Sequence, residues 1–254
     1  MLRANNLTIN RQGNTLLNNV DCEIATKQLV ALVGHNGSGK STLIKALAGE
    51  MASSSGSVTL DGRSISDYGS KELAQHMAYL PQQLPEAAGF TVRELVMLGR
   101  YPHQKWLQKP NQKDKDKVAE ALRVTQTEAF ADRITATLSG GERARAWLAM
   151  CLAQDSRYLL LDEPLAALDM HYQLEVIGLI RRLVDEQGLS VVIIVHDINL
   201  AAQYADRIIA LKNSHVCHKG DIASTMQPDI LRNIFNVEMQ LLDHPITGQP
   251  VAVA

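Results

Sequence analysis

The sequence predicts an α/β fold, and three observations support this prediction. Short apolar segments rich in leucine and β-branched residues are separated by turn residues, which is typical of strands. These segments are 7–9, 20–24 and 29–33. A glycine-rich loop at 34–39 then leads into a helical pattern at 40–48. The apolar runs 158–161 and 191–195 are continuous, as in central strands that are covered on both faces.

The later elements predict a parallel core and a helical subdomain. A helix predicted at 170–185 connects the runs at 158–161 and 191–195, and such a connection predicts parallel strands joined by a right-handed crossover. Between 90 and 154 the apolar spacing is helical, so we expect a separate helical subdomain. Its helices are predicted at 92–98, 118–124 and 142–153.

Two further stretches carry no predicted chemistry. The run 109–117 alternates in charge, and we expect it to be a solvated loop that leads into a helix. From residue 221 onwards, a helix at 229–235 precedes a tail that contains proline and glycine.

Composition and charge favour a globular protein without a nucleic-acid partner. The 254 residues are 46% hydrophobic and 20% charged, and a chain of this length can build a large core without disulfides or metals. The formal net charge of -2 gives no basic field for nucleic acid. Cys22, Cys151 and Cys217 are far apart, as expected for reduced, buried thiols in a cytosolic protein. We find no signal-peptide pattern and no apolar run long enough to span a bilayer, so the chain is expected to stay in the compartment where it is made.

The glycine-rich loop matches the pattern G-x-x-x-x-G-K-[ST], whose backbone N–H groups surround a β-phosphate at a helix N-terminus. The matching residues are Gly34, His35, Asn36, Gly37, Ser38, Gly39, Lys40 and Ser41. Lys40 is expected to reach the β- and γ-oxygens of ATP, the Ser41 hydroxyl to hold Mg²⁺, and Thr42 to add a phosphate contact. The alternative is a glycine turn that only joins a strand to a helix.

Two carboxylates follow the apolar run at 158–161, at the edge of the sheet where α/β folds bind ligands. Asp162 is placed to orient Mg²⁺, directly or through water, and Glu163 to polarise the water that attacks the γ-phosphate. The alternative is an acidic turn before Pro164, and the phosphate loop upstream makes the catalytic interpretation the preferred one.

A second glycine-containing segment precedes the helix predicted at 142–153. It reads Leu138-Ser139-Gly140-Gly141-Glu142, and Ser139 and Glu142 have the S-x-x-E spacing of a capping box. Two glycines in a first turn destabilise a helix, which suggests that a ligand approaches the backbone closely. The segment is therefore predicted to be a second phosphate clamp.

These motifs, in this order, resemble those of ABC ATPases, and the resemblance covers nearly the whole chain. It implies a P-loop NTPase (RecA-like) core with an N-terminal antiparallel β subdomain and an inserted α-helical subdomain. The core would comprise 1–82 and 158–220, the helical subdomain with the signature 83–157, and the C-terminal helix and tail 221–254. It also implies a head-to-tail homodimer in which each signature closes over ATP held by the partner.

The resemblance assigns roles to further residues. Gln82 matches the glutamine that contacts Mg²⁺ and the attacking water, although Gln83 beside it leaves the register open. His196 matches the switch histidine that contacts the γ-phosphate. Asp169 ends the D-loop sequence Ala166-Ala167-Leu168-Asp169, which departs at its first residue from the common Ser-Ala-Leu-Asp. Arg11 stands where many relatives stack an aromatic residue on adenine.

Within the family, three stretches resemble the importers of ferric siderophores, haem and vitamin B12, and most of all the ferric hydroxamate class. They are 79–85, 90–96 and 99–102. The implied partners are integral membrane permease subunits and, indirectly, a periplasmic or surface substrate-binding protein. The chain would then lie on the cytoplasmic face of the inner membrane. Apolar residues near Gln82 would form a groove for a coupling helix of the permease: Phe90, Val92, Leu95 and Met97.

Other interpretations are open to test. Haem or vitamin B12 is the alternative cargo, and a soluble ABC ATPase that acts on nucleic acid or ribosomes is the alternative of another class. A phosphate-loop kinase or GTPase would have no use for the signature, and a purely structural ATP binder would have no use for Glu163. His215, Cys217 and His218 could hold a metal, but an exposed strand after a turn is the preferred interpretation.

Overall fold

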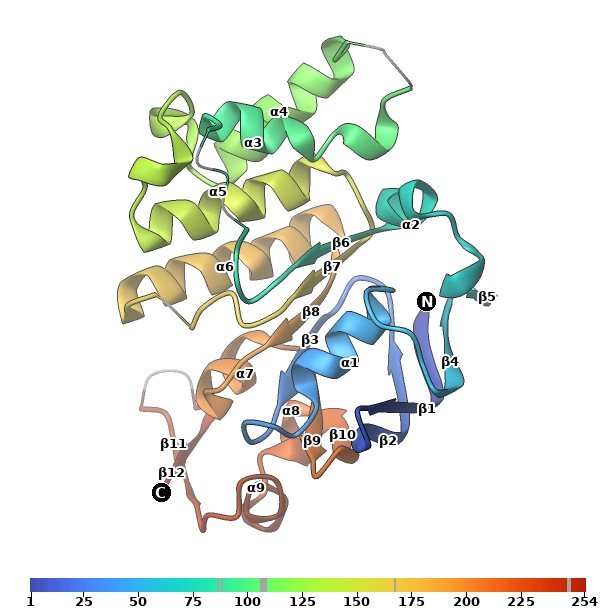
Figure 1. Ribbon diagram of the computed structural model, residues 1–254. Coiled ribbons are helices and arrows are strands. Elements are labelled where there is room, and N and C mark those ends of the chain that lie inside the picture. Colours follow the sequence, from blue (N-terminus) through green and yellow to red (C-terminus); the bar gives the residue numbers. More distant parts are fainter. Residues whose placement is uncertain (86, 88, 106–108, 167, 246–247) are drawn as a thin grey trace. The chain divides into compact units, whose positions relative to one another are not determined.

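The computed structural model describes residues 1–254 except 86, 88, 106–108, 167 and 246–247 (Figure 1). The chain divides into two units. Unit 1 comprises Met1–Asp67 and Arg181–Ala254, and unit 2 comprises Tyr68–Ile180. Within the described residues, no helix combines the length and the apolar character that a membrane span requires. The subdomain boundaries expected from the sequence differ from these units and remain a prediction.

An antiparallel sheet begins unit 1, as predicted, with the strand order β2-β1-β4-β5. Its strands are β1 (Leu2–Arg11), β2 (Asn14–Ile24), β4 (Ser55–Leu60) and β5 (Arg63–Ser64). Gln12 and Gly13 connect β1 to β2, and their φ angles of 51° and 79° are the positive values that a type I′ hairpin turn requires.

A second sheet in unit 1 has the order β10-β9-β3-β8. Its strands are β3 (Leu29–Val33), β8 (Ser190–Ile194), β9 (Arg207–Lys212) and β10 (His215–Asp221). β3 pairs in parallel with β8 and β9, and every residue of β3 and β8 is buried. This burial explains the continuous apolar runs in the sequence. The helices α1 (Lys40–Leu47) and α7 (Ile198–Tyr204) contact β8 and β3 respectively.

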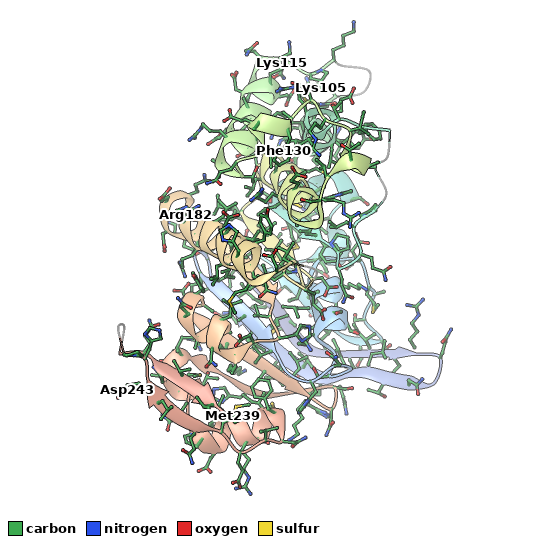
Figure 2. The ribbon with its side chains drawn as sticks, turned by 90° about the vertical axis from the view of Figure 1, so that its left-hand side faces the viewer. Lys105, Lys115, Phe130, Arg182, Met239 and Asp243 are labelled. Atoms are coloured by element: carbon green, nitrogen blue, oxygen red, sulfur yellow. The ribbon has the colours of Figure 1, made fainter. Side chains whose placement is uncertain are left out.

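The C-terminal part of unit 1 is more ordered than the sequence predicted. It contains α8 (Ile222–Thr225), α9 (Pro228–Phe235) and an antiparallel hairpin of β11 (Gln240–Asp243) and β12 (Pro250–Val253). Asn199 of α7 holds the hairpin because it donates to the carbonyl of Ala252 at 3.0 Å and accepts from the Ala252 N–H at 2.8 Å. Met239, labelled in Figure 2, packs on the core beneath it.

Unit 2 holds parallel strands and the helical subdomain. β6 (Met77–Leu80) pairs in parallel with β7 (Tyr158–Leu161), and α2 (Ser70–His76) precedes β6. The helices α3 (Val92–Leu98), α4 (Gln112–Val124) and α5 (Gly140–Ala153) pack on one another, as Figure 1 shows. Short 3₁₀ helices are Ile65–Asp67 in unit 1, and Tyr101–His103, Glu128–Phe130 and Thr135–Thr137 in unit 2. α6 (Met170–Gln187) crosses the boundary between the units.

Reciprocal capping boxes start α3, α4 and α5. In each box the N-cap side chain accepts from the N3 backbone N–H, and the N3 carboxylate accepts from the N-cap N–H. The pairs are Thr91 with Glu94, Asn111 with Asp114, and Ser139 with Glu142. The helix starts of the subdomain are therefore specified locally by sequence.

Asp114 also forms a buried ion pair, which corrects the prediction that the charged stretch 109–117 is solvated throughout. The Arg100 guanidinium donates to Asp114 at 3.0 Å, and the two side chains are only 2% and 4% exposed. Arg100 further donates to the carbonyl of Ala153 at 2.7 Å. Burial opposes ionisation of Asp114, but the Asn111 N–H and the guanidinium outweigh it and hold its pKa below the ordinary value. The pair thus ties α4 to the end of α5.

The cysteines are free thiols, and Cys22 and Cys151 are buried, as predicted. Burial raises the pKa of both Cys22 and Cys151 to about 12, so neither forms a thiolate at neutral pH. Cys217 is half-buried in β10, the strand that follows a turn at Asn213 and Ser214.

Replacing Arg100 with Ala should destabilise the protein by about 3 kcal/mol, because the Asp114 carboxylate would stay buried without its cation. Chemical denaturation at pH 7 measures this loss. The stabilisation depends on an ionised Asp114 whose pKa is lowered by folding, so it is lost as the pH falls through that pKa. The difference in unfolding free energy between wild type and variant should therefore become smaller in acid.

The matched control is Arg3→Ala, which removes an ion pair to Glu23 whose side chains are 45% and 51% exposed. It should cost less than about 1 kcal/mol. Equal losses of unfolding free energy in the two variants would contradict the assignment of Arg100 as a buried structural cation.

Candidate functional site

The phosphate loop connects β3 to α1 in unit 1, as the sequence predicted. Gly34 and Gly39 have φ angles of 136° and 105°, which L side chains rarely adopt. A Cβ atom on Gly34 would lie 2.1 Å from the carbonyl oxygen of Leu211, and one on Gly39 would lie 2.7 Å from the Leu17 side chain. Both glycines are therefore required because the loop packs directly against β2 and β9.

Lys40 is buried at 4% exposure, and its ammonium is held by the loop itself. It donates to the carbonyl oxygens of Gly34 and His35 at 2.8 and 2.9 Å. The same His35 carbonyl accepts from the Ser38 N–H at 3.2 Å. The loop is thus a closed ring with a positive charge inside it.

The loop fits an anionic phosphate on two further observations. The Ser38 side chain is 4% exposed, and its hydroxyl has no hydrogen-bond partner among the described residues, a cost that a ligand oxygen would remove. α1 begins at Lys40 behind Gly39, which has no side chain to cap its first turn, and a helix start attracts negative charge. His35, Asn36 and Gly37 form the exposed rim of the loop.

The acidic strand end lies in unit 2, directly after β7. Asp162 is 1% exposed, its N–H donates to the Leu80 carbonyl at 2.9 Å, and its carboxylate accepts from the Tyr79 hydroxyl at 3.3 Å. Glu163 has a φ of 52° without being glycine, a conformation that costs about 1–3 kcal/mol and is concentrated at functional sites. The Tyr79 contact could not be found from the sequence, because it depends on the register of β6 against β7.

Gln82 reaches the same strand end. Its side-chain amide donates to Glu163 Oε2 at 2.7 Å. This contact favours Gln82 over Gln83 as the matching glutamine. The structure therefore brings Gln82, Asp162 and Glu163 together on the ends of β6 and β7.

The signature segment starts α5. Ser139 Oγ accepts from the Glu142 N–H at 3.3 Å, and Glu142 Oε2 accepts from the Ser139 N–H at 2.8 Å. Arg133 donates to the other Glu142 oxygen at 2.8 Å. The Ser139 N–H, against the effect of burial and with help from Arg133, lowers the pKa of Glu142. Glu142 thus orients the segment rather than offering a titratable group.

Gly141 has an internal reason to be glycine, which the sequence did not reveal. A Cβ atom there would lie 3.1–3.3 Å from ring atoms of Tyr172 in α6. The close approach predicted for a phosphate is therefore already made by an aromatic ring at Gly141. Gly140 and Ser139 begin the helix beside it.

The remaining predicted residues lie at element ends. Asp169 Oδ1 accepts from the Tyr172 N–H at 3.1 Å at the start of α6, and Ala167 of the same D-loop lies outside the described residues. Thr42 lies in the first turn of α1. In unit 1, His196 is exposed after β8, and Arg11 is exposed at the end of β1.

The apolar residues near Gln82 divide into two groups. Val92 and Leu95 are buried, at 0% and 1% exposure, so they belong to the core of unit 2. Phe90 is 42% exposed and Met97 is half-buried. Two large apolar side chains that follow in the sequence are also exposed. These are Leu98 at 48% and Tyr101 at 67%.

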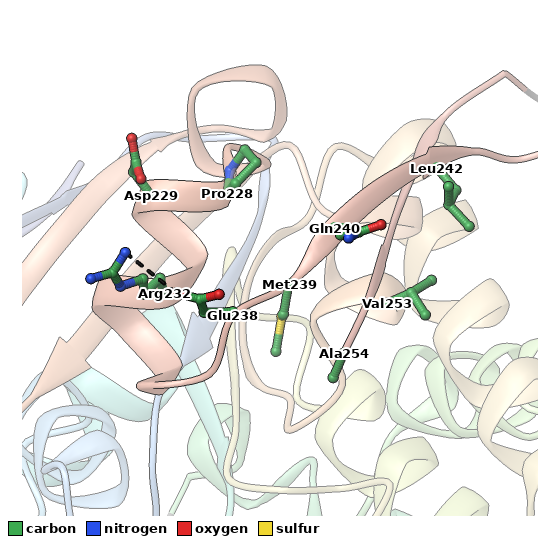
Figure 3. Close-up of a pocket in the computed structure, with 9 residues that line it drawn as sticks. All are labelled: Pro228, Asp229, Arg232, Glu238, Met239, Gln240, Leu242, Val253 and Ala254. Atoms are coloured by element: carbon green, nitrogen blue, oxygen red, sulfur yellow. Dashed lines mark ion pairs between the residues drawn. The ribbon is translucent and has the colours of Figure 1, made fainter.

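A pocket of about 530 Å³ lies elsewhere in unit 1, between α9 and the C-terminal hairpin (Figure 3). Arg232 and Glu238 face each other across its edge at 3.6 Å, while Leu242 and Val253 line the hairpin side. None of the residues predicted for nucleotide chemistry lines it.

Known proteins resemble the chain along almost its whole length. The achromobactin transport ATP-binding protein of Dickeya dadantii is 36% identical over 99% of this chain and 94% of that protein. The iron(3+)-hydroxamate import ATP-binding protein of Bacillus subtilis is 38% identical over 99% and 94%. The hemin import ATP-binding protein of Rhodococcus jostii is 41% identical over 97% and 84%.

Solved structures agree with the fold. A dimeric ATP-binding cassette in a post-hydrolysis state, bound to ADP and phosphate, has a TM-score of 0.76 and 28% identity, covering 87% of this chain and 99% of its own. An ABC transporter in an inward-facing conformation has a TM-score of 0.85 at 24% identity, covering 100% and 97%, and this likeness concerns the fold. A family model described as ABC transporter matches residues 17–166. The chain therefore belongs to the ABC transporter family, in which it is an ATP-hydrolysing subunit.

Proposed function

We propose that the chain binds MgATP at its phosphate loop and hydrolyses it, as a homodimer, to drive import through a membrane permease. The observation that carries this proposal is the closed loop around the Lys40 ammonium, together with the Ser38 hydroxyl, which has no hydrogen-bond partner in the part of the chain that the structure describes. A phosphate group would accept from both. Its oxygens would also take the place of the carbonyls that now hold the ammonium.

Each loop residue has a role in this proposal. The backbone N–H groups from Gly34 to Thr42 surround the β-phosphate, and Lys40 moves from the loop carbonyls to the β- and γ-oxygens. The Ser41 hydroxyl, the Asp162 carboxylate and the Gln82 amide oxygen are oxygen donors of the kind that hold Mg²⁺. Mg²⁺, when bound, neutralises charge on the phosphates. Arg11 offers its planar guanidinium to the adenine ring.

Glu163 is the proposed base. Its carboxylate orients and polarises the attacking water, while Gln82 contacts Mg²⁺ and that water and His196 contacts the γ-phosphate. The strained backbone at Glu163 supports this role, because such strain is retained where geometry at one residue matters.

The signature is the proposed second clamp, supplied by the partner copy. The similar solved cassette is dimeric and holds ADP and phosphate. At the start of α5, Ser139 and the N–H groups of Gly140 and Gly141 would meet the γ-phosphate of the partner's nucleotide, and Asp169 would contact the partner's loop. Hydrolysis would then require two copies.

The proposed cargo is an iron-siderophore of the ferric hydroxamate class. The proposed membrane partner is a permease that is served by a substrate-binding protein. Relatives named for iron(3+)-hydroxamate and achromobactin support an iron-siderophore, and the relative named for hemin keeps haem as the alternative. The exposed side chains of Phe90, Leu98 and Tyr101 are the proposed contacts to the permease. The chain would thus act at the inner face of the membrane that holds the permease.

The base assignment predicts that Glu163→Gln slows ATP turnover by about 100-fold or more, because the amide cannot take a proton from water. Phosphate release measures the rate, and light scattering with ATP should show a stable dimer. Turnover at the wild-type rate would exclude Glu163 as the base.

The clamp assignment predicts that Ser139→Ala lowers turnover at least about 10-fold while a single copy still binds ATP. The substitution also removes an N-cap worth about 1 kcal/mol. Asn111→Ala is the matched control, since it removes the equivalent cap of α4 and should leave turnover within about two-fold. Equal losses of ATP turnover in the two variants would show that Ser139 acts only as a helix cap.

The cargo assignment predicts that a host lacking this chain loses uptake of radiolabelled iron from a ferric hydroxamate. Wild-type protein should restore uptake, and Lys40→Ala should not. Loss of hemin uptake with normal hydroxamate uptake would favour the haem alternative instead.

A further inference from the structure

The C-terminal helix α9 ends against the phosphate loop. The rings of Phe235, the last residue of α9, and His35, the second residue of the loop, meet edge to face with centroids 6.2 Å apart and an interplanar angle of 74°. Such a geometry is the favourable one for aromatic pairs. His35 is exposed and Phe235 half-buried, so the helix supplies the fixed partner of the two.

The position of His35 determines where Lys40 and Ser38 are held in the loop. Its carbonyl oxygen accepts from the Lys40 ammonium at 2.9 Å and from the Ser38 N–H at 3.2 Å. A change in the His35 backbone would therefore displace the charge and the hydroxyl that face the phosphate position.

A second set of contacts fixes α9 to the end of β9, the strand against which the loop packs. The Lys212 ammonium donates to the carbonyl of Asn233 and to Asn236 Oδ1, the latter at 2.7 Å, at the C-terminal end of α9. A cation is favoured there because a helix end carries unsatisfied carbonyls and negative dipole charge. Lys212 directly follows Leu211, whose carbonyl defines the space available to Gly34.

The hydrophobic core also connects α9 to the strand that leads into the loop. Phe235 packs on a buried cluster that includes Val33, the residue immediately before Gly34, together with Ile208 and Ala210 of β9. α9 contacts β9 and β10. The incoming strand of the loop and the end of α9 thus rest on the same apolar surface.

We propose that Phe235 is a positioning residue for nucleotide binding: its ring holds His35, and through the His35 carbonyl it keeps Lys40 and Ser38 in place. This inference rests on the proposed binding of ATP at the loop. It assigns a role in the nucleotide site to a C-terminal helix in which the sequence indicated no chemistry.

The test is a double-mutant cycle with a fluorescent ATP analogue, using the full chain. Phe235→Ala and His35→Ala should each raise the Kd by about 3- to 10-fold, the range expected for an aromatic pair. The Kd of the double variant should be no higher than the higher Kd of the two single variants, because the same contact is lost in all three. Phe235→Tyr, which keeps the ring, should bind like wild type. In Phe235→Ala, kcat at saturating ATP should stay within about two-fold of the wild-type value while KM rises.

Ile230→Ala is the matched control, since Ile230 packs on the same cluster from the same helix. It should lower the thermal unfolding temperature as Phe235→Ala does but leave the Kd unchanged. An unchanged Kd in Phe235→Ala, an equal rise in Ile230→Ala, or multiplicative effects of Phe235→Ala and His35→Ala would overturn the proposal. Lys40→Ala is a separate arm: if it binds the analogue like wild type, the proposed nucleotide site itself fails.

Discussion

The burial of the Lys40 ammonium is the constraint on which the nucleotide half of the structure depends. A cation at 4% exposure is destabilising unless acceptors meet it, and the Gly34 and His35 carbonyls do so. These carbonyls can turn inward only because the loop uses backbone angles that glycine tolerates. The buried strand β3 and the helix α1 then hold the two ends of the loop in place.

Periodicity and caps made most of the fold predictable. β3, α3 and β7 have the bounds that the sequence predicted, because five buried positions in β3, a capping box at Thr91 and an apolar run in β7 are local signals. The outer strands were harder to predict from the sequence. β4, β9 and the C-terminal hairpin were not predicted, since their pairing depends on partners far along the chain. Asp114 was assigned to solvent because sequence alone gives no sign that Arg100 lies beside it.

The candidate site was predictable where a motif is contiguous and unpredictable where contacts cross between elements. The loop residues and the pair Asp162 and Glu163 stand next to one another in the sequence. The ring of Tyr172 against Gly141, the Tyr79 hydroxyl on Asp162 and the ring of Phe235 on His35 join residues between 31 and 200 positions apart. Each reflects tertiary packing that a sequence pattern does not encode.

While the Gln82 amide occupies Oε2 of Glu163, that oxygen is engaged and is less able to take a proton from water. In the proposed mechanism, a subunit with this hydrogen bond is in a resting state. Gln82 lies outside any helix or strand, in a bend after β6. A subunit that keeps this hydrogen bond would hydrolyse ATP slowly, so turnover in the proposed mechanism requires that Gln82 first release Glu163.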